Sequence, residues 1–223
     1  MIHKRDCFGA ETACLATTIK WTGLMGLMLF CSEVQSQRVE QLYADGGLKI
    51  TGVMDEEGKQ GRWEFFYPHG QLNASEIYQN DQLEGESLTY YPNGKLQSRE
   101  SYHADIPSDS GFYYFSNGNL KRKGLYENGL YAGIWLSYYE SGALKSEGTY
   151  HDGLPHGKWV VYHDNGIVSQ KGEYYQGVED GFWQFYNDEG KLNYEGQYER
   201  GKEIGVWYEY TKKGKKKVYK NYQ

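Results

Sequence analysis

The stretch GIWLSYYESGALKSEGTYHDGLPHGKW, residues 133–159, decides the fold. It contains two runs rich in aromatic residues, and a short segment that contains glycine follows each run. Aromatic residues favour β-strands, whereas glycine marks turns. Asn-Gly occupies the first of these turns in other parts of the chain, at residues 93–94, 117–118 and 165–166. Because Asn-Gly is a strong signal for a type I′ turn, each such stretch is predicted to form a β-hairpin.

The same pattern recurs along most of the chain with a period of 24 residues. Glycine returns without a slip in register at Gly46, Gly70, Gly94, Gly118, Gly142, Gly166, Gly190 and Gly214. Self-similarity of this kind is typical of repeat architectures, and the density of glycine disfavours helix. The sequence therefore predicts an all-β, elongated β-hairpin repeat solenoid of about seven and a half units, forming a single twisted antiparallel sheet.

The chain divides into three predicted parts, which are an export leader over residues 1–36, a linker over 37–45 and the repeat domain over 46–223. In the leader, basic residues precede an apolar run over residues 21–31, and Val34 and Ser36 suit a cleavage site. The run is about half as long as a membrane-spanning helix. We therefore expect export to the periplasm, the cell envelope or the outside of the cell, with a frayed N-terminal helix as the alternative.

All three cysteines, Cys7, Cys14 and Cys31, lie in this leader. Disulfides and cysteine-based metal sites are therefore not expected in the repeat domain. Lipid attachment at Cys31 is a weaker alternative, because Phe30 is bulky where lipoprotein signals have a small residue. The formal net charge of −6 argues against a nucleic-acid partner, whose phosphates require a basic surface.

A two-residue turn at residues 141–142 would set the register of the fourth hairpin. The pairs that follow are Tyr139 with Leu144, Trp135 with Gly148, and in the next units Trp159 with Gly172 and Trp183 with Gly196. We expect each indole ring to lie over the glycine opposite it and to shield the backbone there. Because side chains alternate between faces, the tryptophan, this glycine, the leucine and the late tyrosine of each unit are expected on one packed face.

The other face is predicted to carry a continuous tyrosine stripe bordered by mixed charge. Its candidate binding residues are Tyr90, Tyr114, Tyr138, Tyr162 and Tyr186. Flat surfaces rich in tyrosine bind partners at a low cost in conformational entropy. Paired aromatic residues also stabilise a sheet by about 0.2–1 kcal/mol each, so a purely structural role for the stripe is equally open.

Units two and three depart from the pattern. Ser87 and Glu100 stand at the paired positions of unit two, and Asp109 and Gly111 replace the usual glycine and tryptophan in unit three. The missing rings predict a weaker segment or a groove. We expect a partner to bind either the tyrosine stripe or this groove.

The pattern G-x-W-x-x-Y-Y-x-N-G-x-L-x-x-x-G-x-Y, over roughly residues 42–223, resembles the MORN repeat. It is similar to the bacterial variant of this repeat that is found in proteins named as YwqK-family antitoxins of toxin–antitoxin systems. This resemblance implies rows of β-hairpins in a long twisted sheet, with roles in protein–protein scaffolding and, for some members, contact with membrane lipids. Together with the leader, it suggests an envelope protein or an extracytoplasmic immunity-type protein.

The sequence contains no recognised pattern of catalytic, cofactor-binding or metal-binding residues. His151, His156 and His163 cluster near acidic residues, but their spacing matches no known ligand set, so we expect solvated turn histidines. Phosphate loops, nucleophile elbows and zinc-protease motifs are missing. The predicted function is therefore a non-catalytic protein-binding scaffold without a cofactor.

The alternative is an envelope component that binds polysaccharide through the aromatic stripe, or anionic lipid through a lysine tail. The tail contains Lys212, Lys213, Lys215, Lys216, Lys217 and Lys220. Lysines also protect an edge strand against unwanted pairing, which is the structural interpretation of this tail. Lipid capture by lysines should weaken steeply with salt, whereas aromatic stacking should not.

Overall fold

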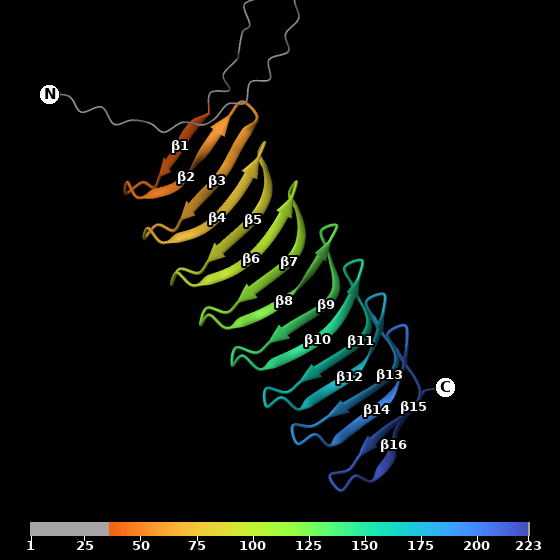
Figure 1. Ribbon diagram of the computed structural model, residues 1–223. Coiled ribbons are helices and arrows are strands. Elements are labelled where there is room, and N and C mark those ends of the chain that lie inside the picture. Colours follow the sequence, from red (N-terminus) through yellow and green to blue (C-terminus); the bar gives the residue numbers. More distant parts are fainter. Residues whose placement is uncertain (1–35, 223) are drawn as a thin grey trace, which may run out of the picture. The chain divides into compact units, whose positions relative to one another are not determined.

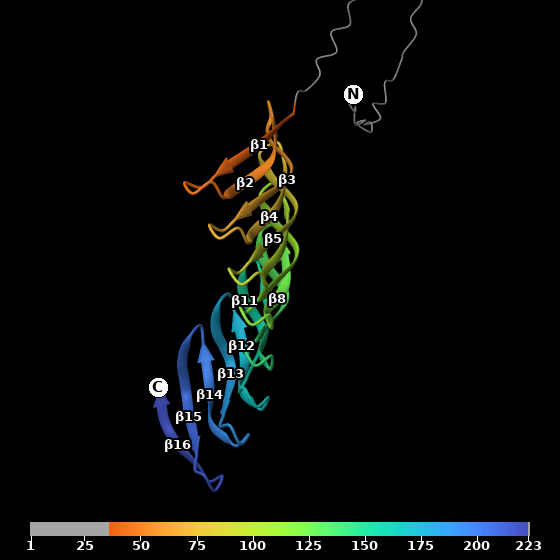
Figure 2. The ribbon, with the colours of Figure 1, turned by 90° about the vertical axis from the view of Figure 1, so that its left-hand side faces the viewer.

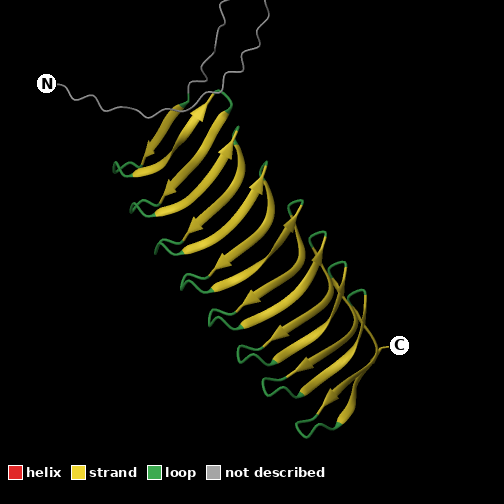
Figure 3. Ribbon diagram, in the orientation of Figure 1, coloured by secondary structure: helices red, strands yellow, loops and turns green. Residues whose placement is uncertain are grey.

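The computed structural model describes residues 36–222. These residues form one antiparallel sheet of 16 strands, whose order in the sheet is their order in the sequence. Every described element of regular structure is a strand (Figures 1 and 3). The predicted all-β hairpin repeat is therefore confirmed. The expected leader, residues 1–36, lies outside the described residues except for Ser36.

The strands are β1 (Gln37–Leu42), β2 (Leu48–Asp55), β3 (Gly58–Phe66), β4 (Leu72–Gln79), β5 (Gln82–Tyr90), β6 (Leu96–His103), β7 (Ile106–Tyr114), β8 (Leu120–Glu127), β9 (Leu130–Tyr138), β10 (Leu144–His151), β11 (Leu154–Tyr162), β12 (Val168–Tyr175), β13 (Val178–Tyr186), β14 (Leu192–Glu199), β15 (Lys202–Tyr210) and β16 (Lys216–Tyr222). Figure 2 shows these strands as one twisted layer. Residues 37–45, predicted as a linker, instead contain β1. Val39 pairs there with Gly52, as the tryptophan of a later unit pairs with its glycine.

One long edge of the sheet, here called the wide-turn edge, contains the longer turns. In each of them the backbone N–H of one residue donates to the carbonyl of the residue four positions later. The pairs are 43 and 47, 67 and 71, 91 and 95, 115 and 119, 139 and 143, 163 and 167, 187 and 191, and 211 and 215. In the fourth unit the Tyr139 amide donates to the Ala143 carbonyl at 2.9 Å, so this turn contains three residues. Only Gly142 has a positive φ, of 96°, as in a type I turn followed by a glycine bulge. The prediction of type I′ turns at this edge is wrong.

The extra turn residue changes the pairing beside the turn. Leu144 pairs with Tyr138, so the predicted pair of Leu144 with Tyr139 is wrong. A bulge at Lys145 then restores the predicted register. The three tryptophan–glycine pairs are confirmed, namely Trp135 with Gly148, Trp159 with Gly172 and Trp183 with Gly196. This leucine is consequently paired with a tyrosine of the stripe, and it does not lie beside a tryptophan.

The opposite long edge, here called the tight-turn edge, contains the two-residue turns. Both central residues have positive φ in six of them, at 80–81, 104–105, 128–129, 152–153, 176–177 and 200–201. This is the type I′ conformation, whose twist matches that of the flanking strands. Each of these turns is also tied to the hairpin before it. For example, the Gly153 amide donates to the Tyr131 carbonyl at 3.0 Å.

The core is a row of indole rings on one face, here called the tryptophan face. The buried rings, 1–5% exposed, are Trp63, Trp135, Trp183 and Trp207. Each ring lies over a glycine, as predicted, but that glycine belongs to the preceding strand. A Cβ placed on Gly172 would lie 2.2 Å from the ring of Trp183, and one on Gly148 would lie 2.0 Å from that of Trp159. The prediction that each ring covers the glycine paired with it across its own hairpin is therefore wrong.

Two units that lack the tryptophan show that the sequence encodes this packing. Ser87 and Gly111 stand where other units have tryptophan. At the matching positions of the preceding strand, Glu76 and Glu100 replace the glycine. A side chain therefore occupies the glycine position only where no ring has to lie on it.

Tyrosines fill the space that the missing ring leaves in the third unit. The Tyr113 hydroxyl donates to Glu100 and lies 2.5 Å from the Tyr126 hydroxyl. Burial, followed by these hydrogen bonds, raises the pKa of Tyr113 well above its usual range. Burial also raises the pKa of Tyr126 to about 12. On the tryptophan face, tyrosine rings therefore fill the space in unit three where a groove was expected.

Each long strand bends two residues before its tryptophan position, at a residue with positive φ. Glycine occupies this place in the other units, whereas the third unit has Asp109 with a φ of 57°. A left-handed backbone costs a residue other than glycine about 1 kcal/mol. We expect Asp109→Gly to raise the free energy of unfolding by about that amount and Asp109→Ala to lower it. Urea denaturation followed by tryptophan fluorescence measures both, and a less stable Asp109→Gly variant would contradict the strain.

Candidate functional site: the tyrosine face

The face opposite the indole rings, here called the tyrosine face, carries the predicted binding residues. The tyrosine stripe consists of Tyr90, Tyr114, Tyr138, Tyr162 and Tyr186, which are the last residues of β5, β7, β9, β11 and β13. All five are half-buried. Each pairs across its hairpin with an aliphatic residue, in order Leu96, Leu120, Leu144, Val168 and Leu192. The structure therefore brings the stripe together as one row beside the wide-turn edge.

A second row of aromatic residues lies one position later, at residues 43, 67, 91, 115, 139 and 163, and most of its members bind the backbone of the next unit. The Tyr139 hydroxyl donates to the carbonyl of Tyr162 at 2.7 Å. The same bond joins Tyr43 to Phe66, Tyr67 to Tyr90, and Tyr91 to Tyr114. His163 takes this place before Tyr186, with its Nε2 atom 3.1 Å from the carbonyl oxygen. Sequence reasoning missed this row, although doubled aromatics such as Tyr138-Tyr139 signal it.

Polar side chains contact the stripe at Tyr162 and Tyr186. The Tyr186 hydroxyl donates to Gln184 at 2.9 Å, and the Lys171 ammonium lies 5.5 Å from the centre of the same ring. The Tyr162 hydroxyl lies 3.5 Å from a Glu147 carboxylate oxygen. Burial and then this carboxylate raise the pKa of Tyr162, so its hydroxyl stays protonated at neutral pH. The stripe thus combines aromatic surface with hydrogen-bonding groups and charges of both signs.

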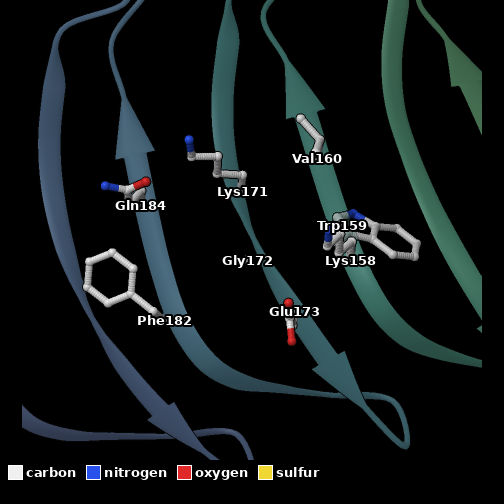
Figure 4. A pocket seen from close by; sticks show the side chains of 8 residues that line it. All are labelled: Lys158, Trp159, Val160, Lys171, Gly172, Glu173, Phe182 and Gln184. Atoms are coloured by element: carbon white, nitrogen blue, oxygen red, sulfur yellow. The ribbon is translucent and has the colours of Figure 1, made fainter.

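Shallow hollows lie beside the stripe on the tyrosine face. The hollow around Gly172 has a volume of about 400 Å³. Figure 4 shows Phe182 and Gln184 on one side of it and Lys171 in the middle, while Trp159 turns toward the neighbouring strand. Its charged residues are Lys158, Lys171 and Glu173. Hollows of about 320 and 330 Å³ lie at the equivalent glycines Gly124 and Gly196.

Exposed apolar side chains border these hollows, and sequence reasoning missed them too. Ile134 is 63% exposed, Leu125 is 49% exposed and Phe182 is 48% exposed. Ile134 and Phe182 share the position directly before the tryptophan, which is the signal that could have found them. Leu125 and Ile134 border one hollow and Phe182 borders two others, and exposed apolar side chains grouped in this way are typical of interaction sites.

The three histidines do not form one site. His163 belongs to the wide-turn edge, whereas His151 and His156 lie in β10 and β11 near a tight turn, with ring centres 5.7 Å apart. His151 is largely exposed and lies 3.2 Å from Asp152. The expectation of a solvated turn histidine suits His151 but is wrong for His163, whose ring lies within hydrogen-bond distance of the Tyr186 carbonyl oxygen. Within residues 36–222, no three potential metal ligands come together, and no helix could cross a membrane.

Acidic side chains of neighbouring strands neutralise part of the lysine tail. The ion pairs are Lys216 with Glu195 at 2.7 Å, Lys217 with Glu209 at 2.6 Å and Lys220 with Glu203 at 3.8 Å. The basic charge that could attract an anionic surface is therefore reduced. These pairs favour the structural interpretation of the tail, as protection for the edge strand β16.

Glu195, which is 8% exposed, is expected to make the fold sensitive to acid. Burial raises the pKa of its carboxyl, but hydrogen bonds from Lys216, Tyr210 and Gln184 outweigh burial and hold the pKa below its ordinary value. A carboxyl with a lowered pKa stabilises the fold at neutral pH, and this contribution is lost as the pH falls through the folded-state pKa. We expect the melting temperature to drop between about pH 5 and pH 3, and to drop less in Glu195→Gln. Circular dichroism melts across this range measure the difference, and equal slopes would contradict it.

Comparison with known proteins identifies the repeat. The pattern of the family described as MORN repeat variant matches residues 59–80, 83–104, 111–128, 132–152, 155–175 and 179–200. No curated protein matches the chain. A crystal structure of a protein with unknown function from Bacteroides fragilis is similar over 84% of this chain and 90% of that one, with 9% identity and a TM-score of 0.12, a likeness too weak to say anything about function. Since the matched segments cover more than half of the sequence, the chain belongs to the MORN repeat variant family.

Proposed function

We propose that this chain is a non-catalytic scaffold that binds a protein partner on its tyrosine face. MORN repeats are generally scaffold modules, which supports this role. The observation that carries the proposal is the apolar surface beside the stripe, where Ile134 is 63% exposed and Phe182 is 48% exposed. A protein interface combines such an apolar centre with a polar rim, and Lys158, Lys171 and Glu173 supply the rim here.

More specifically, we propose that this scaffold acts as an antitoxin- or immunity-like protein that is exported to the cell envelope. The resemblance to YwqK-family antitoxins supports the first half of this role, and the apolar run at residues 21–31 supports the second. Antitoxins and immunity proteins act by holding another protein. A single continuous hydrogen-bonded sheet suits this task, because a preorganised surface loses little conformational entropy on binding.

Affinity capture from an envelope extract tests the scaffold. The bait is the full chain, compared with the variant Ile134→Ser/Phe182→Ser and with the variant Tyr138→Ser/Tyr162→Ser/Tyr186→Ser. The first variant removes exposed side chains, so we expect it to stay folded, and thermal melts verify this for both. Glu140→Gln, at an exposed wide turn, is the matched control. We expect one protein to be retained by the wild type and the control but lost by the folded variants. Equal retention by all four would exclude the tyrosine face.

The alternative is an envelope component that binds polysaccharide or anionic lipid. The stripe favours polysaccharide, because Gln184 and Glu147 place hydrogen-bonding groups beside the rings of Tyr186 and Tyr162, where sugar hydroxyls could meet them. The ion pairs of the lysine tail weigh against lipid. Co-sedimentation with insoluble polysaccharide and with vesicles containing anionic lipid, at low and high salt, separates these cases. Only binding through lysines should be lost at high salt.

A further inference from the structure

A row of exposed aliphatic side chains runs along the tight-turn edge. This aliphatic ridge consists of Ile106, Leu130, Leu154 and Val178, the first residues of β7, β9, β11 and β13. They are 51%, 49%, 48% and 38% exposed, respectively. The ridge lies at the opposite end of these strands from the tyrosine stripe, whose residues end the same four strands. The two features are therefore separate surfaces.

Each ridge side chain rests on the glycine of the next tight turn. A Cβ placed on Gly153 would lie 3.3 Å from Leu130, and the same contact joins Ile106 to Gly129, Leu154 to Gly177 and Val178 to Gly201. Where Asp105 replaces the turn glycine, the ridge position holds Gln82. This packing links neighbouring hairpins, yet it leaves about half of each side chain in water. Linking the hairpins does not require that exposed half.

Acidic side chains surround the ridge. Those in or beside its turns and strand starts are Asp105, Asp109, Glu127, Asp152, Glu179 and Asp180. The basic residues in or beside the same turns are Arg200 and Lys202, so acidic residues outnumber basic ones there. The opposite edge is mixed, because its wide turns carry Lys95, Lys121, Lys145 and Lys191 together with Glu140, Asp164, Asp188 and Glu189. The tight-turn edge over these four hairpins therefore offers an apolar line within a negative field. A partner that places Lys or Arg beside its own apolar residues is complementary to it.

The spacing of the ridge favours a helix over a strand. Neighbouring strands lie about 4.8 Å apart, so ridge residues on alternate strands are about 9.6 Å apart. An α-helix rises about 1.5 Å per residue, so every seventh residue returns to nearly the same side after about 10.5 Å. Aliphatic residues at this spacing can face the four ridge residues in turn. An extended strand repeats its side about every 6.8 Å and would fall out of step.

We propose that the aliphatic ridge is a docking site for a basic amphipathic α-helix of a partner protein, with an aliphatic residue at every seventh position. The helix lies across the ends of β7, β9, β11 and β13, along the long axis of the sheet. Its aliphatic residues cover the outer half of each ridge side chain, and its basic residues face the acidic turns. This site does not depend on the tyrosine face.

A synthetic helical peptide tests the ridge directly. The peptide has about 25 residues, enough to span the ridge, with leucine at every seventh position and lysine or arginine beside each leucine. A control peptide has the same composition with leucine at every fifth position, and a second control has glutamate in place of the basic residues. Fluorescence anisotropy measures the affinity of each peptide for the full chain. We expect both controls to bind at least about tenfold more weakly.

The variant Leu130→Gln/Leu154→Gln shows whether the ridge is the site. It copies Gln82, which stands at the same position of an earlier unit, so it should fold, and a thermal melt verifies this. We expect it to lose at least about tenfold in affinity for the first peptide, while Ile134→Ser/Phe182→Ser binds like the wild type. No binding, equal binding of the peptides, or an unchanged affinity of the folded ridge variant would overturn the proposal. Loss in the tyrosine-face variant alone would move the helix to that face.

Discussion

Trp183→Ala should lower the free energy of unfolding of the surrounding hairpins by about 3–5 kcal/mol. The ring is 1% exposed and lies over Gly172. Its Nε1 atom donates to the Glu173 carbonyl at 3.1 Å, and the Tyr174 ring meets it edge-on at 5.2 Å. Alanine would leave a cavity, an unpaired carbonyl and a neighbouring ring without its contact. Because each repeat contacts only its neighbours, the loss should concentrate in β12 to β14.

Amide hydrogen exchange measures this local loss, and urea denaturation measures its global effect. Amides of β12 to β14 should exchange much faster in the variant, while those of β3 to β5 should change little. Phe182→Ala is the matched control, because Phe182 is the preceding residue and is 48% exposed. It should cost less than about 1 kcal/mol. Similar losses for the two variants would show that the indole row is not the core.

Gly172→Ala should destabilise the same hairpins by about 2–3 kcal/mol. A Cβ at this position would lie 2.2 Å from Cδ2 of Trp183, far inside van der Waals contact. The indole cannot move aside without losing its hydrogen bond to Glu173. Urea denaturation measures the effect. A loss below about 0.5 kcal/mol would mean that the ring does not lie over this glycine.

A double-mutant cycle isolates the contact. In a Trp183→Ala background, Gly172→Ala should cost almost nothing, because the clashing ring is gone, so the two substitutions should be strongly non-additive. The pair Gly172→Glu/Trp183→Ser copies Glu76 and Ser87 of an earlier unit. We expect this pair to be more stable than Gly172→Glu alone. Additive effects in both cycles would contradict the assignment of ring to glycine.

Most of the fold could be predicted from sequence because the period, the turn glycines and the alternation of side chains are backbone properties. The tryptophan–glycine pairs followed from them correctly. The glycine that lies beneath each ring was not predicted correctly. Strand pairing determines which residues are opposite each other, whereas side-chain torsions determine where a large ring lies. The substitutions of Glu76 with Ser87, and of Glu100 with Gly111, contained that information. Type I′ turns were predicted at the wide-turn edge but occur at the tight-turn edge. The error arose because Asn-Gly suits both a type I′ turn and the last two positions of a three-residue turn.

The candidate site could be predicted only in part. The position of the tyrosine stripe follows from alternation, and the structure aligns it as one row. The hydrogen bonds that hold it, such as that from Tyr139 to the Tyr162 carbonyl, join residues 23 positions apart in neighbouring units and depend on how the turns of these units stack. The exposure of Ile134 and Phe182 depends on the bend of the strand at the preceding glycine. Neither property is visible from a single repeat.

The position of each indole over the preceding strand gives the sheet a direction of growth. A chain is synthesised from its N-terminus, and each new hairpin therefore brings its own ring to a glycine that is already in place. The growing end then exposes a strand with a glycine to water, and no apolar indole ring is left exposed there. Growth in the reverse direction would leave an uncovered indole at every step. Lys220 stands where the strands that lie beneath a ring have glycine, so β16 does not offer the bare backbone on which an indole lies elsewhere in the sheet.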